Sequence, residues 1–529
     1  MIEKEFNLLD EKWILAIDEN CRIGEYSLKE IFEEAHRLKA LSGELPTQDF
    51  AVMRFLLAVL YAVYQKHDVD GSDAEIVDEE EAFDRWEKLW KKGSFDIDII
   101  GRYLESYRDR FFLFHPTRPF YQVPMPKEIK ATEYMSPKLN GEISESSNKS
   151  RLFSLFSGDE KKQMGFAEAT RWLINLNAYD DTSAKPSVKN VGLPSCGAGW
   201  VGKLGPIYIE GNNFFQTLLL NLVLVSEDGL PFPIGVPTWE PDTAKMDERT
   251  PISMPKSPVE ILTLQSRRLL LIRDGNKVTG YRLLGGDIVD KNNAFIEQMT
   301  IWRQDKDGNF NPSRHDPSKS LWRNYQSILV KNMDERYNHL PGVVRWMRDL
   351  EDCNFIDYDA IRISVVGVQY ADKDFFVEDY ISDSLDINAS LLSAMNDGWN
   401  VRIAKIISKT DLIVSSLWNY SRNVYGICGC DDSYCKTMAN RAKAQAYYDI
   451  DLPFRSWLRN IDPSFDDVDK VMNDWIQKVA GVVIDIAKEL LREVGERALI
   501  GNGEGSAFTC YRKMTGDLYK LIHGDVVDE

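Results

Sequence analysis

The last third of the chain places apolar residues at alternating three- and four-residue steps, which is the spacing of a single buried helix face. This periodicity predicts four helices, over residues 391–420, 436–459, 466–494 and 507–522. In the third of them the apolar face comprises Val468, Val471, Trp475, Val479, Val482, Ile486 and Leu490. Four long helices joined by short loops predict a four-helix bundle.

The first two-thirds combine short apolar runs with long connections rich in proline, glycine and asparagine. Helical patterns cover residues 48–66, 82–90 and 99–108. The first of these is apolar nearly all round and follows Pro46, with Thr47 as the expected N-cap. Residues 269–273 and 278–283 predict two strands of a hairpin that turns at Asp274-Gly275-Asn276.

These patterns predict an α+β protein of two domains, as the length of 529 residues also favours. Residues 1–378 are expected to form a large mixed domain with short strands and long loops. Residues 379–529 are expected to form the four-helix bundle.

A glycine-rich segment, Gly197-Ala198-Gly199-Trp200-Val201-Gly202, has the spacing of a dinucleotide-binding fingerprint. That motif needs a strand before it and a helix that opens at its last glycine. Here a loop rich in breakers comes first, and Pro206 stands where the second helical turn should run. We expect instead a mobile loop that carries Lys203, then a strand over 207–211 and a helix from Asn213.

The charge balance argues against a protein that grips nucleic acid by itself. The chain has 83 acidic and 64 basic residues, a formal net charge of −19. Phosphate neutralisation dominates nucleic-acid affinity, so an autonomous binder is usually basic. A subunit that touches DNA at a few points within a basic assembly remains compatible with this charge.

The sequence also argues against a membrane protein or a secreted one. The most apolar stretch, residues 50–64, is interrupted by Arg54 and is too short for a membrane span. The first residues lack the basic start and apolar run of a signal peptide. Seven cysteines without a regular framework favour a reducing compartment, so a cytoplasmic location is expected.

The residues known to support enzyme and metal chemistry do not form a recognisable motif. None of the six histidines belongs to a metal-spaced pair, and His115 favours a packed core position over a general base. Cys428, Cys430 and Cys435 crowd together without a second pair or a nearby histidine. We therefore expect no catalytic residues, no metal and no cofactor.

Several blocks, in order and spaced across nearly the whole chain, resemble one family. They are N-L-L-x-x-x-W-I at residues 7–14, P-F-x-Q at 119–122, T-x-L-L-N at 217–221, P-T-W-E at 237–240 and L-T-L-Q-S-R-R at 262–268. Together with the terminal helices they resemble CasA, the large subunit of the type I-E CRISPR interference complex Cascade. The resemblance implies a binding subunit that works with other Cascade subunits and a guide RNA, not an enzyme.

CasA-like proteins help to recognise the short protospacer-adjacent motif (PAM) in target double-stranded DNA, help to start strand separation and recruit a helicase-nuclease. Base pairing with the guide reads the long sequence, so the protein reads only a short duplex element. The family reads the PAM largely from the minor groove. This groove is narrow and its base-pair code is degenerate, so a close approach of the protein backbone and a few hydrogen-bond donors suit it better than a recognition helix.

The resemblance places four elements of this chain at nucleic acid. The glycine loop falls on Gly197, Gly199, Gly202 and Lys203, although glycines of a tight connection would look the same. A lysine loop falls on Lys291, or on Asn293 if the register shifts by two residues. A hairpin wedge has its turn at residues 369–373, with Gln369 and Tyr370 as contacts. A basic loop over 148–165, which would reach the guide, offers Asn148, Phe153 and Phe156.

Two other interpretations remain open. The chain could be a purely architectural partner-binding subunit whose loops contact no DNA. It could also be a hydrolase that uses a carboxylate site no motif reveals.

Overall fold

A computed structural model describes residues 4–145, 156–183, 185–186, 196–242, 246, 252–331, 336, 338–371, 373–501, 503 and 505–523. The chain forms two compact units. Unit 1 comprises Met1–Lys319, Asp334–Leu350 and Arg362–Ser384. Unit 2 comprises Ser320–Met333, Glu351–Ile361 and Leu385–Glu529. The expected boundary at 378/379 lies inside a strand, and unit 2 includes two earlier segments.

The helices of the first 352 residues are α1 (Leu28–Glu33), α2 (Pro46–Tyr64), α3 (Glu79–Lys92), α4 (Ile97–Ser106), α5 (Ser136–Leu139), α6 (Phe166–Tyr179), α7 (Phe214–Leu220), α8 (Pro258–Leu262), α9 (Tyr325–Leu329) and α10 (Gly342–Asp352). The strands are β1 (Glu5–Asn7), β2 (Ile14–Asp18), β3 (Ile23–Tyr26), β4 (Leu38–Leu41), β5 (Phe112–Phe114), β6 (Thr132–Met135), β7 (Ile207–Glu210), β8 (Arg267–Asp274), β9 (Lys277–Gly285), β10 (Trp302–Gln304), β11 (Phe310–Pro312), β12 (Ala360–Ala371) and β13 (Phe376–Asn388).

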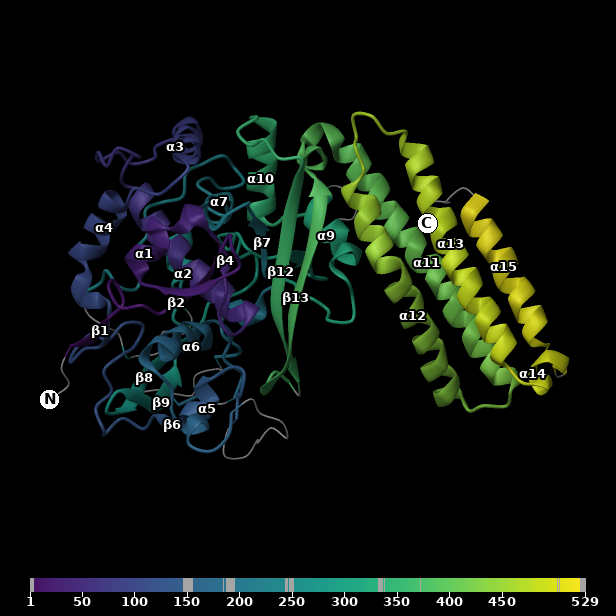
Figure 1. The fold of residues 1–529 in the computed structure, drawn as a ribbon, viewed down its shortest axis with the longest axis horizontal. Coiled ribbons are helices and arrows are strands. Elements are labelled where there is room, and N and C mark those ends of the chain that lie inside the picture. The colour runs from purple at the N-terminus through teal and green to yellow at the C-terminus, as the bar shows by residue number, and fades with distance from the viewer. Residues whose placement is uncertain are drawn as a thin grey trace. The chain divides into compact units, whose positions relative to one another are not determined.

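Helix α2 is the core of unit 1, where it packs against α6 and α8 (Figure 1). Nearly every one of its side chains is buried, which explains its apolar composition on all sides. Arg54 is tolerated there because it forms an ion pair with Glu297, with both side chains at most 2% exposed. The expected N-cap was wrong: the helix begins at Pro46, and Leu45 occupies the cap position without a side-chain bond. Proline suits the first turn because its missing N–H would have no helical partner there.

Helix α2 is also the one described helix with the length and apolar composition to cross a membrane. Its most apolar window is 94% buried inside the protein, which is the burial of a core helix.

Small antiparallel sheets surround this core rather than one large sheet. In the described part of the chain, three sheets are three-stranded, in the orders β3-β2-β4, β6-β9-β8 and β13-β12-β7, and two are strand pairs, β1-β5 and β10-β11. The predicted hairpin is confirmed as β8 and β9, where Asp274 pairs with Lys277 across a turn with Gly275 at φ +56°. The predicted strand after the glycine-rich segment is β7, and Asn213 caps α7 by accepting a bond from the Gln216 N–H.

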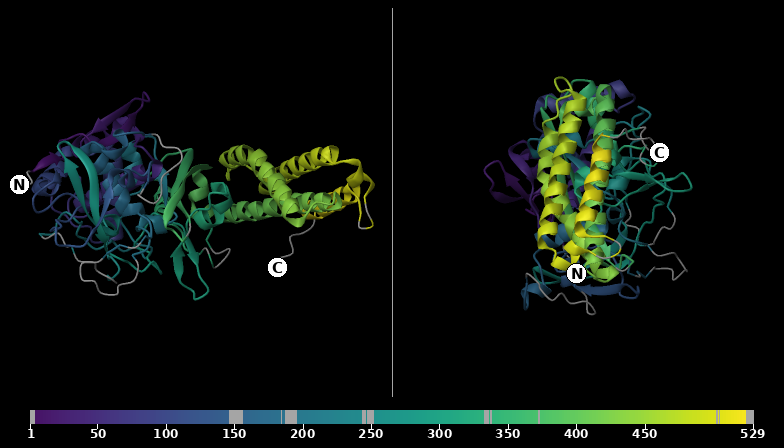
Figure 2. Two further views of the ribbon diagram at one scale, coloured as in Figure 1. Left: turned by 90° about the horizontal axis from the view of Figure 1, so that it is seen from below. Right: turned by 90° about the vertical axis from the view of Figure 1, so that its right-hand side faces the viewer.

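The four predicted long helices are confirmed as α11 (Asp397–Ile427), α12 (Asp432–Arg459), α13 (Val468–Glu493) and α15 (Ala507–His523), with a short α14 (Glu496–Ile500) before the last. They run side by side (Figure 2), and α11 contacts the other three. In α13 the residues Trp475, Val479 and Leu490 are buried as predicted. Val468, Val471, Val482 and Ile486 are only half-buried, because the buried stripe runs instead through Met472, Ile476, Ala480, Val483 and Ala487.

Candidate nucleic-acid interface

The glycine-rich segment is packed against its own chain, contrary to the expected mobile loop. A Cβ at Gly199 would lie 2.4 Å from the carbonyl oxygen of Ala178, at the end of α6. A Cβ at Gly202 would lie 2.2 Å from the hydroxyl of Tyr370. Both glycines are buried, so their small size serves close packing inside unit 1.

Gly197 needs to be glycine for a different reason, since its φ of +67° lies in the left-handed region. Its carbonyl accepts a bond of 2.7 Å from Arg267, a buried residue of β8. Arg267 also forms an ion pair of 2.5 Å with Asp180. The turn at Gly197 is therefore fixed to the strand by a buried guanidinium.

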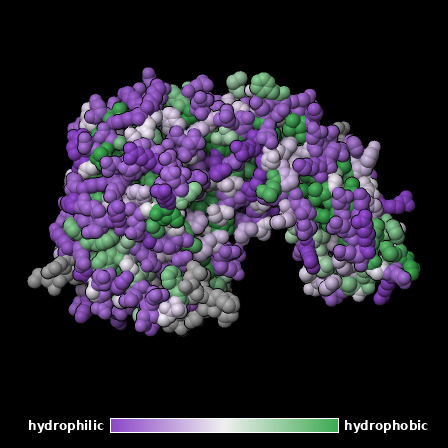
Figure 3. Space-filling model, in the orientation of Figure 1, coloured by the Kyte–Doolittle hydropathy of each residue, from purple (hydrophilic) through white to green (hydrophobic). Residues whose placement is uncertain are grey.

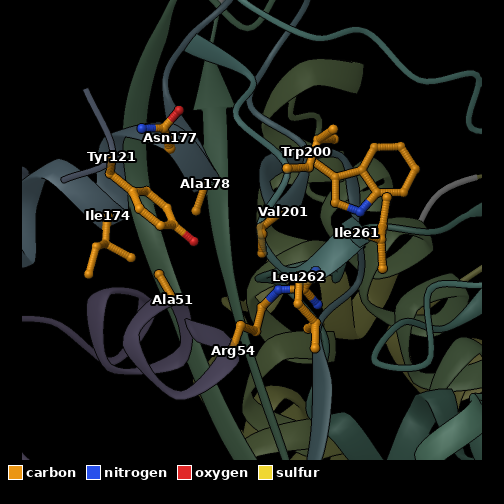
Figure 4. A pocket seen from close by; sticks show the side chains of 11 residues that line it. Ala51, Arg54, Tyr121, Ile174, Asn177, Ala178, Trp200, Val201, Ile261 and Leu262 are labelled. Carbon is orange, nitrogen blue, oxygen red and sulfur yellow. The ribbon is translucent and has the colours of Figure 1, made fainter. Parts of the chain in front are cut away.

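Trp200 anchors the middle of the segment. Its backbone N–H donates to Ser266 Oγ at 3.0 Å, and its indole N–H donates to Glu297 at 2.8 Å. Figure 4 shows Trp200 and Val201 beside a small cavity that Arg54 also lines. At about 20 Å³ this cavity has room for about one water and none for a base or a nucleotide.

Lys203 lies in a cationic environment. Burial and then the charge of Arg267 lower the pKa of its ammonium to about 8; Cys196 opposes this shift, and Lys291 and Arg314 add smaller lowering effects. Sequence spacing predicted the position of this lysine but not its neighbours, which come from three distant segments. A cationic group so placed favours the approach of an anion.

The loop that contains Lys291 is closed by Asn293. Asn293 adopts φ +52°, its side-chain oxygen accepts from the Phe310 N–H at 2.7 Å, and its amide donates to Asn309 at 3.2 Å. Lys291 itself is exposed. The structure thus places Lys291 outward and uses Asn293 to tie the loop to β11.

The hairpin expected after Val365 consists of β12 and β13, seen as the two long arrows in Figure 1. Its turn lies slightly later than expected, because Lys373 and Asp374 have φ of +60° and +66° and Phe375 follows at 42% exposure. Gln369 donates across the hairpin to Glu378 at 2.9 Å. The expected turn at 369–373 was therefore early by about two residues.

Tyr370 is held in place by its hydroxyl, which donates to the Tyr179 carbonyl at 2.6 Å. Burial raises the pKa of this phenol well above its usual value. The guanidinium of Arg314 lies over its ring, 4.9 Å from the centroid. In this arrangement the ring packs against protein and is not presented for base stacking.

Arg314 is a residue that the sequence did not point to. It donates from Nε to the Gly202 carbonyl at 2.7 Å and pairs through both terminal nitrogens with Asp374. Thr182 donates to the carbonyls of Asp374 and Lys373 from the other side. Arg314 thus brings the glycine-rich segment and the hairpin turn together, and only the fold reveals this.

The basic loop is described only in part. Asn148 and Phe153 lie outside the described residues. Phe156 is half-buried, and Lys161 and Lys162 form ion pairs with Glu145 and Asp159. The guide-contacting interpretation of this loop stays a prediction.

Several cations of the bundle are also paired within unit 2. Arg402 pairs with Asp469, and Arg455 with Asp451. Among the described residues, no cluster of His, Cys, Asp and Glu has a metal-binding arrangement. His115 is buried, accepts from the Arg118 N–H at 2.9 Å and has a pKa lowered by burial, as suits a packed residue.

Comparison with known proteins decides the family. The profile of the CRISPR-associated protein Cse1 family matches residues 7–486. The chain belongs to this family. A curated relative, CRISPR-associated protein CasA/Cse1 of Thermus thermophilus, is 29% identical over 352 residues, which cover 66% of this chain and 65% of that protein. The aligned part is thus just under two thirds of the relative's length.

Solved Cse1 structures share the fold over nearly the whole chain. Cse1 of Thermobifida fusca has a TM-score of 0.84 at 26% identity, with 98% of each chain covered. Cse1 of Acidimicrobium ferrooxidans has a TM-score of 0.78 at 21% identity, with 99% of this chain and 100% of that chain covered. The predicted α+β architecture and the resemblance to CasA are both confirmed.

Proposed function

We propose that this Cse1-family chain is the non-catalytic large subunit of a type I-E RNA-guided interference complex in the cytoplasm. It recognises the PAM in target duplex DNA, helps to start strand separation and recruits the helicase-nuclease. A structural neighbour with 16% identity and a TM-score of 0.70 is named a CRISPR RNA-guided surveillance complex, which supports assembly with other subunits and guide RNA. The acidic net charge fits this role, because the assembly supplies most of the attraction to DNA.

One observation carries the proposal. Three segments that the resemblance assigns to DNA converge in unit 1: the packed glycine segment, the loop of Lys291 and the turn between β12 and β13. Arg314 contacts the first and third, and Lys291 lies close enough to influence the proton affinity of Lys203. Elements fixed to one another by the part-buried contacts of Arg314 form a preorganised surface.

The turn between β12 and β13 suits strand separation because it presents an exposed apolar side chain. Phe375 is exposed at the turn, whereas Tyr370 is tied back to the Tyr179 carbonyl. Apolar side chains inserted between base steps unstack DNA at a cost of about a few kcal/mol per step. We therefore assign the wedge contact to Phe375 rather than to Tyr370.

The test uses the complex assembled with guide RNA and the remaining subunits. Binding is measured on target duplexes that differ only in the flanking PAM. Lys291→Ala should reduce the preference for the accepted flank, and Phe375→Ala should slow strand opening with little loss of initial binding. Lys39→Ala, an exposed lysine of β4, is the matched control for removal of one charge.

The alternatives predict other outcomes. If these variants impair assembly while affinity per assembled complex is unchanged, the architectural interpretation is correct. Steady turnover of a substrate by the isolated chain, abolished by substitution of a carboxylate cluster, would instead establish a hydrolase.

A further inference from the structure

Lys203 is half-buried, as is Gly197, whereas Gly199 and Gly202 are buried. The side chain runs across Gly197, with Cε 3.4 Å and Nζ 3.7 Å from the position that a Cβ on that glycine would take. The absence of a side chain at residue 197 therefore leaves room for the ammonium. Gly199 and Gly202, by contrast, face the chain's own atoms and offer no comparable approach.

The charged groups that face Lys203 come from several elements and are mostly cations. They are Arg267 of β8, Lys291 of the 290–293 loop and Arg314 after β11, with the Cys196 thiol as the exception. The nearby carboxylates are engaged elsewhere, since Asp180 pairs with Arg267 and Asp374 with Arg314. Within the described residues no carboxylate forms an ion pair with Lys203, and the sequence of residues 187–195 contains no acidic residue.

Resting on the proposed function, we infer that Lys203 binds a backbone phosphate of the target duplex rather than a base edge. A mostly desolvated ammonium among cations gains most from a full negative charge, which a phosphodiester has and the neutral acceptors of the minor groove lack. Phosphate contacts position a protein on DNA without reading sequence. Lys203 then supplies affinity, and PAM preference comes from the other elements.

Phosphate binding at this site is coupled to protonation. The pKa of Lys203 in the free protein is about 8 because of burial and the three neighbouring cations. A bound phosphate stabilises the ammonium and raises that pKa, so the complex takes up protons when it binds DNA above neutral pH. The affinity for target DNA is then highest and constant below about pH 8, and it declines as the pH rises through that value.

The experiment measures binding of the assembled complex to target duplex across salt concentration and across pH 7–9. Lys203→Gln should weaken binding by roughly tenfold and reduce the slope of log affinity against log salt by about 1, with the ratio between accepted and altered flanks unchanged. Lys203→Arg should retain the slope and flatten the pH dependence, because a guanidinium does not titrate in this range. Lys39→Ala should leave slope and pH dependence unchanged, and co-purification of all subunits reports intact folding.

Two results would overturn the inference. The first is an unchanged salt slope for Lys203→Gln in an intact complex. The second is a loss of the affinity difference between accepted and altered flanks while the salt slope stays constant, which would mean that Lys203 contacts a base edge. If the unmodified complex does not distinguish flanks at all, the proposed PAM function fails, yet the slope still decides whether Lys203 binds phosphate.

Discussion

Arg314 forms a two-point ion pair with Asp374, with both nitrogen–oxygen distances at 2.9 Å. The same guanidinium donates to the carbonyl of Gly202. One side chain thereby fixes the turn of the β12–β13 hairpin relative to the glycine-rich segment, and both belong to the surface that we assign to DNA.

Replacing this guanidinium by an ammonium should loosen the hairpin turn. Arg314→Lys keeps the charge but loses the planar fork that satisfies Asp374 and Gly202 together. Because the pair is about one-third exposed, we expect a loss of only about 1 kcal/mol in the free energy of unfolding. Amide exchange at residues 373–376 should rise, and an unchanged exchange rate there would argue against Arg314 as a positioning residue.

Gly199 should not tolerate a methyl group. In Gly199→Ala the new Cβ would meet the Ala178 carbonyl, a backbone atom that cannot move aside, and overpacking of this kind costs about 1–3 kcal/mol. The matched control is Gly481→Ala in α13, where a Cβ meets nothing within 4 Å. That control should raise stability by about 0.8–1 kcal/mol through helix propensity, as measured by denaturant unfolding.

Gly202 and Tyr370 should be coupled. A methyl group at residue 202 overlaps the Tyr370 hydroxyl, so Gly202→Ala should cost about 1–3 kcal/mol by displacing the ring. Tyr370→Phe removes the overlapping oxygen and should recover part of that loss. A double-mutant cycle in urea should give a coupling energy of about 0.5 kcal/mol or more, whereas strict additivity would contradict the contact.

The buried pair of Arg54 and Glu297 should be sensitive to the loss of either partner. Arg54→Met leaves a buried carboxylate whose pKa the guanidinium had lowered, and we expect a cost of about 3–5 kcal/mol. Because the folded pKa of Glu297 lies below its ordinary value, the pair's contribution is present above pH 4.5 and lost as pH falls through the folded pKa. The difference in Tm between pH 7 and low pH should therefore be smaller in the variant than in the unmodified chain.

Asp49 should make the protein less stable as pH rises. Burial, followed by the neighbouring Glu44, raises the pKa of Asp49 from 3.8 to about 7, so the folded state binds a proton that the unfolded state releases. Stability is therefore highest below about pH 4 and declines up to about pH 7. Asp49→Asn keeps an acceptor for the Gly43 N–H and should stabilise by on the order of 2 kcal/mol at pH 8, with little effect at pH 4.

The face of the protein seen in Figure 3 is largely hydrophilic, with small groups of apolar residues between the polar ones. This distribution follows from the strong patterning of the sequence. Long runs of three- and four-residue apolar spacing made α11, α12, α13 and α15 predictable to within several residues, whereas turn positions, which lack such runs, were not.

The sequence by itself determined the element types wherever a local rule is sufficient: the helical bundle through three- and four-residue spacing, the β8–β9 hairpin through its Asp-Gly-Asn turn, and the start of α7 through Asn213. Tertiary structure alone decided what the glycines do and which charges meet. Gly199 and Gly202 are small because Ala178 and Tyr370 occupy the space beside them, and the pKa of Lys203 is lowered first by burial and then by cations from distant segments, Arg267 above all. Such effects depend on distances between atoms far apart in the chain, and burial strengthens them, so no spacing pattern along the sequence records them.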